Sequence, residues 1–268
     1  MKKTVFILTV VLLLAVFGVS AFMVGSYIIE SKEQAEKFDA LSQLKENAKE
    51  NATLATEATQ ATDPEGTFGE AVIRDENNML AEYGEIYALN DDVVGWIRID
   101  GTKVDYPVMQ TPDEPNYYLY RDFDKKDSSR GSIYAREECD INEPSDNITL
   151  YGHNMRDGSM FAAANAYIHK STWEENPLIF FDTLYEYHTY KIFSVFKTSA
   201  NIGEGFTYHN MIDAADKEDF DSFIAKCKEL SFYDTGITPQ YGDKIICLST
   251  CEYTLDNGRL VIAAVRIS

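Results

Sequence analysis

The sequence predicts a mainly β protein: a closed or nearly closed β-barrel with a few inserted helices. Many short apolar runs alternate with turn signals such as Asp100-Gly101. The chain also contains 17 tyrosines and 15 phenylalanines, and aromatic residues suit strands. Short strands joined by turns favour a barrel, because closing the sheet leaves it without exposed edges.

The chain opens with a candidate membrane anchor. Met1-Lys-Lys3 precedes a run without charged residues from Thr4 through Ile29, longer than the roughly 20 apolar residues that cross a bilayer. The two lysines favour a cytoplasmic N-terminus, with the remaining chain outside. A cleaved signal peptide is the alternative, because Val19-Ser20-Ala21 resembles a cleavage site. The apolar run continues beyond that site, so we expect an uncleaved anchor.

These features divide the chain into four parts: a short cytoplasmic N-terminus at 1–3, a transmembrane signal-anchor at 4–29, an extracellular stalk or helical linker at 30–75, and a folded domain at 76–268. Within the stalk, residues 31–50 predict a charged helix, because Ala35, Phe38, Leu41 and Leu44 recur at near-helical spacing. Residues 51–68 are rich in Ala, Thr and Glu, which predicts weak structure there.

The folded domain opens with a predicted helix at 79–89, followed by strands separated by turns. Pro107 has no backbone N–H, which restricts its strand to an edge or a bulge. Ser159 can cap a helix that runs through Tyr167, and residues 216–230 form a clear amphipathic pattern. The predicted strands are 94–99, 104–109, 131–134, 147–151, 178–181, 187–196, 244–251 and 259–267.

Composition argues against several classes of function. The formal charge is −20, with 44 acidic against 24 basic residues, whereas nucleic-acid binding requires a basic surface. Cys247 and Cys251 would lie about 13 Å apart along one strand, beyond the reach of a disulfide. We therefore expect neither a disulfide nor a metal site, and Cys227 and Cys247 are interpreted as core residues. Cys139 lies in a polar loop, with no role predicted.

Three residues at strand ends could make one acyl-transfer site. Cys251 ends the strand at 244–251, His153 follows the strand at 147–151, and Arg259 opens the last strand. A thiol attacks an amide well only as the thiolate, which needs a nearby positive charge. The oxyanion that then forms needs a fixed hydrogen-bond donor. The other histidines are interpreted as structural or solvated: His169, His188 and His209.

Two segments resemble the signatures of the sortases, specifically class B. Leu248-Ser-Thr-Cys251 is similar to the nucleophile signature, with Cys247 in place of its first threonine, and Tyr151 to Phe161 (Tyr-Gly-His-Asn-Met-Arg-Asp-Gly-Ser-Met-Phe) is similar to the class B histidine segment. The interval from Cys251 to Arg259 is shorter than in some class B members. Shorter landmarks follow in the family's order: Val94-Gly-Trp96, Asp105-Tyr-Pro-Val108, Tyr117 to Phe123 and Gly131-Ser-Ile133.

The resemblance covers about residues 79–268. It implies a sortase-type closed β-barrel of about eight strands, with N-terminal helices and a helix in the connection before the nucleophile strand. It makes Cys251 the nucleophile, His153 the general acid/base and Arg259 the oxyanion or substrate-positioning group. More weakly, it suggests a peptide groove lined by Ser249, Thr250 and Glu252.

The implied reaction is a transpeptidation on the outer side of the cell membrane. The thiol would cleave a sorting motif in secreted proteins that carry a C-terminal sorting signal, leaving a thioacyl enzyme. An amino group of a peptidoglycan precursor, or of a pilin lysine, would then resolve it. The resemblance implies no cofactor and no metal, and no nucleic-acid partner is expected.

Two other functions remain open from the residues alone. An extracytoplasmic cysteine peptidase or hydrolase would use water as the acceptor. Papain-like folds usually place the cysteine before the histidine, whereas here His153 precedes Cys251 by 98 positions. A non-catalytic surface binding module would simply bury both residues.

Overall fold

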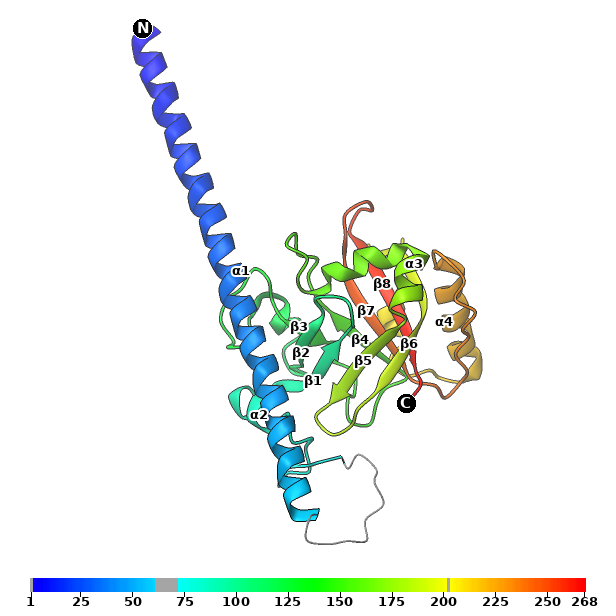
Figure 1. The fold of residues 1–268 in the computed structure, drawn as a ribbon. Coiled ribbons are helices and arrows are strands. Elements are labelled where there is room, and N and C mark those ends of the chain that lie inside the picture. The colour runs from blue at the N-terminus through cyan, green and yellow to red at the C-terminus, as the bar shows by residue number, and fades with distance from the viewer. Residues whose placement is uncertain (1, 61–71, 202) are drawn as a thin grey trace. The chain divides into compact units, whose positions relative to one another are not determined.

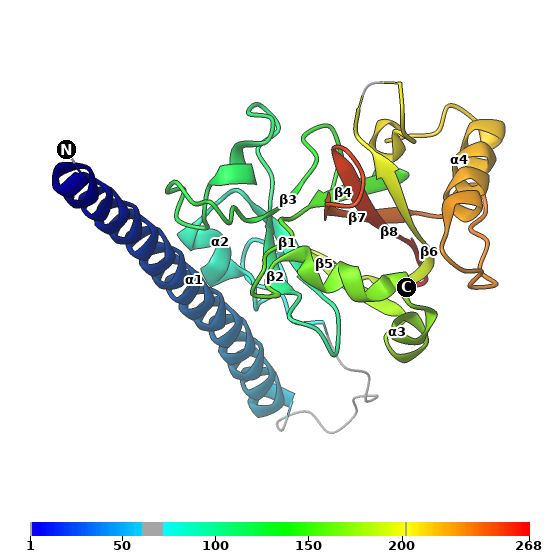
Figure 2. The same ribbon diagram turned by 90° about the horizontal axis from the view of Figure 1, so that it is seen from above.

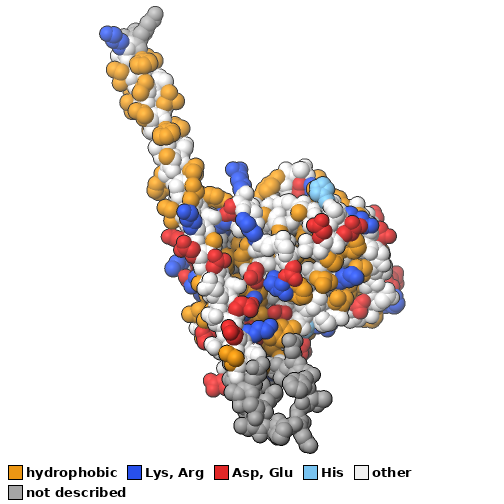
Figure 3. All heavy atoms as spheres, viewed as in Figure 1, with side chains coloured by type: hydrophobic (Ala, Val, Ile, Leu, Met, Phe, Trp, Pro, Cys, Tyr) orange, Lys and Arg blue, Asp and Glu red, His pale blue; other side chains and the backbone are white. Residues whose placement is uncertain are grey.

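The computed structural model describes residues 2–60, 72–201 and 203–268 of the chain. They belong to two compact units, Met1–Gln43 and Leu44–Ser268. The first unit is helical throughout its described part, and helix α1 (Lys2–Gln60) begins in it (Figure 1). Among the described residues, this helix alone is long and apolar enough to cross a membrane by length and composition. Figure 3 shows hydrophobic side chains along its N-terminal part.

The sequence-based prediction of weak structure from residue 51 is wrong for residues 51–60, because α1 continues to Gln60. This stretch contains no Gly or Pro before Pro64 and includes several alanines, the strongest helix formers. The rest of the predicted weak segment up to Phe68 falls at residues 61–71, which lie outside the described residues.

The second unit contains a closed eight-stranded barrel within its described residues, as predicted. The strand order around the barrel is β1-β2-β3-β4-β7-β8-β6-β5, and β1 pairs with β5 to close it. The strands are β1 (Val93–Arg98), β2 (Asp105–Met109), β3 (Ile133–Ala135), β4 (Asn147–Tyr151), β5 (Leu178–Thr183), β6 (Thr189–Ser199), β7 (Ile245–Glu252) and β8 (Gly258–Arg266).

Two of the strand pairs are parallel, β2 with β3 and β4 with β7, and the others are antiparallel. The β4–β7 pair joins segments that are far apart in the sequence. Pro107 lies where β2 faces β1 alone, because β3 pairs only with Val108 and Met109. This local edge agrees with the position predicted from its missing N–H.

Helix α4 (Lys217–Leu230) covers one side of the barrel beside β6 (Figures 1 and 2). Asp216 caps it by accepting from the backbone N–H groups of Glu218 and Asp219 at 2.9 and 3.0 Å, as an N-cap aspartate should. Its apolar face packs in one cluster with buried side chains of β6, β7 and β8. The predicted helix at 216–230 is confirmed, and so is the core position of Cys227.

The predicted helix at 79–89 is shorter in the structure, where α2 spans Gly84–Leu89. The carboxylate of Asp75 accepts from the backbone N–H of Met79 at 2.9 Å, and the N–H of Leu80 donates to the carbonyl of Leu184 at 2.8 Å. Leu80 also forms an antiparallel bridge with Arg74, so the backbone at this point is paired as in a sheet and the helix begins after it.

The helix predicted after Ser159 is a 3-10 helix, η2 (Phe161–Ile168), and Ser159 does not cap it. Its hydroxyl instead donates to Asp157 at 2.6 Å. The prediction also missed three short elements, η1 (Tyr117–Tyr120), α3 (Lys170–Glu175) and η3 (Tyr208–Asn210).

Candidate active site

Cys251 and Arg259 lie directly opposite each other on β7 and β8. Cross-strand partners project from the same face with Cβ atoms about 4.5–5.5 Å apart. Nη1 of Arg259 donates to the carbonyl oxygens of Asn257 and Gly258 at 3.2 and 3.0 Å and to the side-chain oxygen of Asn257 at 3.1 Å. Within the described residues, Nε and Nη2 of Arg259 make no hydrogen bond. The turn therefore holds the guanidinium while leaving donors for another acceptor.

The parallel pairing of β4 with β7 carries the His153 segment alongside the strand that contains Cys251. The N–H of Gly152 donates to the carbonyl of Ser249 at 3.1 Å. Nδ2 of Asn154 donates to the carbonyl of Cys251 at 2.8 Å. His153 lies between these two links, and neighbouring strand backbones run about 4.8 Å apart. The fold thus brings the histidine and cysteine segments together from distant positions in the chain.

The imidazole of His153 is held by a backbone carbonyl. Its Nε2 lies 2.8 Å from the carbonyl oxygen of Leu119. A carbonyl can only accept, so this bond assigns the proton of the neutral ring to Nε2 and leaves Nδ1 as the acceptor. The ring of Tyr120 lies beside it, with centroids 5.8 Å apart. Together these contacts fix which nitrogen can exchange a proton.

Ser249 and Thr250, two of the predicted substrate-lining residues, are buried and hydrogen-bonded within the protein. The hydroxyls of Ser249 and Tyr208 lie 2.5 Å apart. The hydroxyl of Thr250 donates to the carbonyl of Gly152 at 2.7 Å. Here they join β7 to neighbouring segments, and their contact with a substrate remains a prediction.

The third predicted groove residue, Glu252, organises the turn after Cys251. Its carboxylate accepts from Nζ of Lys197 at 2.7 Å, from the hydroxyl and N–H of Thr254 at 2.7 and 3.0 Å, and from the N–H of Leu255 at 3.1 Å. Burial by itself would raise the pKa of this carboxyl, but these bonds outweigh it and lower the pKa to about 2. Glu252 is therefore charged at neutral pH, and its carboxylate is hydrogen-bonded within the protein. Its contact with a substrate likewise remains a prediction.

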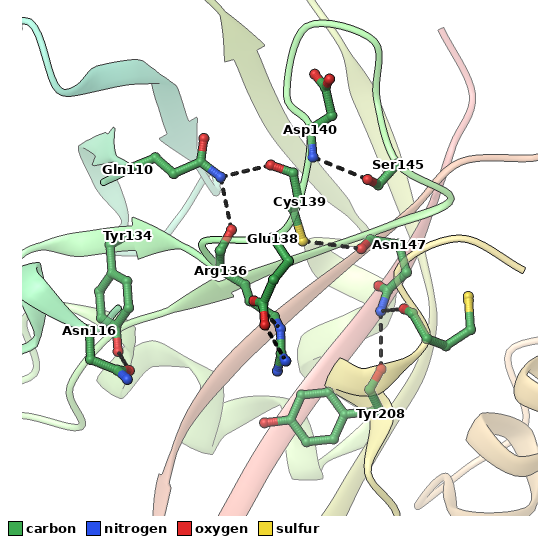
Figure 4. A network of polar contacts seen from close by, with 11 residues as sticks. Gln110, Asn116, Tyr134, Arg136, Glu138, Cys139, Asp140, Ser145, Asn147 and Tyr208 are labelled. Carbon is green, nitrogen blue, oxygen red and sulfur yellow. Dashed lines mark hydrogen bonds and ion pairs between the residues drawn. The ribbon is translucent and has the colours of Figure 1, made fainter. Parts of the chain in front are cut away.

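A polar network holds η3 against the barrel next to this site (Figure 4). Nε2 of Gln110 donates to the carbonyl of Cys139 at 2.7 Å, and the Cys139 thiol donates to the carbonyl of Asn147 at 3.5 Å. Nδ2 of Asn147 then donates to the carbonyls of Tyr208 and Met211 at 3.1 and 2.8 Å. The network joins the loop before β4 to η3, and so supports the tyrosine that contacts Ser249.

The four thiols lie in different surroundings. Cys251 is half-buried, whereas Cys139, Cys227 and Cys247 are buried. Burial raises the pKa of Cys139 to about 11 and raises the pKa values of Cys227 and Cys247 well above the usual thiol range. The predicted core positions of Cys227 and Cys247 are confirmed. A buried thiol of raised pKa is inert, which leaves Cys251 as the accessible one.

Alkylation of the native protein should therefore modify one thiol. With iodoacetamide at neutral pH, we expect one equivalent of label on Cys251, and labelling of the other three only after unfolding in guanidinium. Mass spectrometry of digested protein gives the labelled positions. Similar labelling of several thiols in the native protein, or an unreactive Cys251, would contradict the assignment and favour a binding module.

The region that carries these residues matches a known protein family. The family model "Sortase domain" matches residues 97–267, which include β4, β7, β8 and the His153 loop. The chain belongs to the sortase family. It is similar to Sortase B of Listeria monocytogenes, with 33% identity over 184 residues, covering 68% of this chain and 72% of that protein. The class B resemblance in the sequence is thereby confirmed.

Solved structures agree with the assignment. The Staphylococcus aureus sortase B–substrate complex superposes with a TM-score of 0.71 at 25% identity, covering 90% of this chain and 99% of that one. A sortase B complexed with triglycine also superposes with a TM-score of 0.71 at 25% identity, covering 89% of this chain and 99% of that one. This sortase is a sortase B-type cysteine transpeptidase of the kind that acts in cell-wall sorting.

Sequence reasoning missed two groups of this sortase's candidate site. The carbonyl of Leu119 leaves no trace in a sequence, because every residue carries one. The amide of Asn154 was visible beside His153, but its bond to the carbonyl of Cys251 depends on the pairing of β4 with β7. Only the strand order of the barrel places the two segments side by side.

Proposed function

We propose that this sortase is held in the cell membrane by residues 4–29 and acts outside the cell on secreted proteins that carry a C-terminal sorting signal. The uncharged run after Met1-Lys-Lys3 supports the anchor and its orientation. The structure of a relative with its substrate supports a peptide substrate. The observation that carries the proposal is the meeting of three segments around Cys251, with Arg259 opposite it and His153 on the adjacent strand end.

In the first half-reaction, the Cys251 thiol gives its proton to Nδ1 of His153, and the thiolate sulfur attacks a backbone carbonyl carbon of the sorting motif. The carbonyl oxygen becomes an oxyanion, which Nε or Nη2 of Arg259 stabilises by donating a hydrogen bond. The C–N bond then breaks, and His153 gives the proton on Nδ1 to the departing amine. The product is a thioester between Cys251 and the new C-terminus of the substrate.

In the second half-reaction, an amine attacks the thioester carbonyl. His153 accepts the proton of the attacking amine as base, as microscopic reversibility requires. The C–S bond breaks, a new amide forms, and the departing thiolate takes the proton back from His153, which restores the thiol. The acceptor is an amino group of a peptidoglycan precursor, and a pilin lysine is the alternative. The sortase B solved with triglycine supports a flexible amine of this size.

An amine-dependence assay tests this function. The full chain in detergent is incubated with peptides carrying candidate sorting motifs, with and without a glycine-peptide or diamino-acid acceptor. We expect a ligated product that requires the acceptor and forms faster than the hydrolysed peptide. Cleavage at one rate, with water alone as the acceptor, would identify a hydrolase instead.

Arg259→Ala should slow this reaction without abolishing it. Loss of one oxyanion donor typically costs about 10²–10³ in rate, equivalent to about 3–4 kcal/mol. We therefore expect kcat/KM to fall by that factor, measured with the same ligation assay. Arg266→Ala, at the far end of β8, is the matched control and should retain nearly full activity. Full activity in Arg259→Ala would show that Arg259 does not stabilise the oxyanion.

A further inference from the structure

The loop that carries His153 is compact and conformationally demanding. The N–H of Phe161 donates to the carbonyl of His153 at 3.0 Å, and Asn154 forms an antiparallel bridge with Met160. Two residues near its end lie in positive-φ conformations, Gly158 at +81° and Met160 at +56°. A non-glycine residue in such a conformation persists only where the surroundings hold it. We therefore expect contacts with neighbouring residues to stabilise this end of the loop.

The tip is held by a buried arginine. Nη2 of Arg130 donates to the carboxylate of Asp157 and to the hydroxyl of Ser159. The same carboxylate accepts from the N–H and hydroxyl of Ser159 at 3.0 and 2.6 Å. The side chain of Arg130 is 2% exposed and that of Asp157 is 29% exposed. An arginine this deeply buried needs such partners, because an unpaired charge in the interior is strongly unfavourable.

The residues that follow Arg130 pack against the segment that orients the imidazole. Gly131, next in sequence, has φ of +58°, and a Cβ there would lie 2.4 Å from the carbonyl oxygen of Leu119. The N–H of Ser132 donates to the carbonyl of Tyr118 at 3.0 Å. The Arg130 segment therefore lies directly against Leu119, whose carbonyl binds Nε2 of His153. Arg130 and its neighbours thus contact the His153 loop at two places. Arg130 binds Asp157 at the tip of the loop, and the Leu119 carbonyl beside Gly131 binds the imidazole of His153.

We propose that Arg130 and Asp157 are positioning residues that hold the imidazole of His153 in register with Cys251. This inference rests on the acid/base role proposed for His153. Neither residue touches substrate; each acts through the loop and through the Leu119 carbonyl. A misplacement of about 1 Å can lower a rate about 10²-fold, so loss of the pair should slow the chemical steps while leaving peptide binding largely intact.

The test compares Asp157→Asn with Asp127→Asn in the full chain. Asp127 is the control, because its carboxylate pairs with Arg121 in a neighbouring loop and is 89% exposed. With a sorting-motif peptide and an amine acceptor, we expect kcat of Asp157→Asn to fall about 10–100-fold and KM to change less than about threefold. Asp127→Asn should match the wild type. Arg130→Lys keeps the positive charge but lacks the planar guanidinium with its several fixed donors, so its kcat should lie between those of the wild type and Asp157→Asn.

A pH profile separates positioning from loss of stability. The profile of kcat/KM reports the essential acid and base of the free enzyme. It should shift in Asp157→Asn and stay in place in Asp127→Asn. A smaller folded fraction would instead lower the activity without moving the profile, over the pH range in which circular dichroism shows that fraction to be constant. Wild-type kcat and profile in Asp157→Asn, measured where the wild type ligates normally, would overturn the inference. No ligation by the wild type would instead reject the proposed function.

A second variant tests the same inference in case Asp157→Asn does not fold. If circular dichroism shows that Asp157→Asn is unfolded, Ser159→Ala removes only the hydroxyl shared by Arg130 and Asp157. We expect this variant to fold and to lose several-fold in kcat at constant KM. An unchanged kcat in folded Ser159→Ala would overturn the positioning role.

Discussion

Cys251→Ala is expected to abolish both thioacyl formation and ligation. The variant has no nucleophile at the end of β7, and no other thiol can substitute. Cys139, Cys227 and Cys247 are buried, and burial raises the pKa of each thiol. Mass spectrometry of the enzyme incubated with a sorting-motif peptide measures the covalent species, and chromatography of the products measures ligation.

Cys247→Ala is the matched control for this experiment. Cys247 lies on the same strand and the same face, two strand repeats away, but it is fully buried in the cluster with α4. Its replacement leaves a small cavity and no change at the reacting groups, so most activity should remain. An inactive Cys247→Ala together with an active Cys251→Ala would show that Cys251 is not the nucleophile.

His153→Ala is expected to lower kcat/KM by about 10²–10⁴, the usual contribution of a positioned acid/base. The departing amine would then leave without a proton donor, and the attacking amine would lack a base. The measurement is kcat/KM for the sorting-motif peptide across pH, where the imidazole-dependent limb should disappear in the variant.

His169→Ala is the control for the histidine, because His169 is exposed and lies beyond η2, outside the loop that carries His153. It should leave both the rate and the pH profile unchanged. A His153→Ala enzyme within a few-fold of the wild-type rate would remove the imidazole from the mechanism and leave Cys251 without its proposed partner.

The barrel could be predicted from the sequence because its signals are local. Short apolar runs, the Asp100-Gly101 turn and the amphipathic pattern at 216–230 are each visible within a short stretch of sequence. Each of the eight predicted strands overlaps one observed strand. The class B motifs added the expectation that His153, Cys251 and Arg259 work together, which spacing alone left open.

The errors arose where tertiary contacts decide local structure. Leu80 pairs with Arg74 in an antiparallel bridge, which takes the start of the predicted helix at 79–89. Ser159 bonds to Asp157 and Arg130 in place of capping η2. For the same reason the Leu119 carbonyl could not be predicted, because its role depends on a segment 34 residues away in sequence.

The position of the acyl group during turnover shows directly whether Cys251 is the nucleophile of a transpeptidase. The wild-type enzyme is mixed with a sorting-motif peptide, quenched in acid, digested and sequenced by mass spectrometry, with and without an amine acceptor. We expect a thioacyl adduct on the peptide containing Cys251, which disappears as ligated product forms when the amine is added. An adduct on Cys139, Cys227 or Cys247, or an adduct on Cys251 that decays at the same rate with and without the amine, would contradict it.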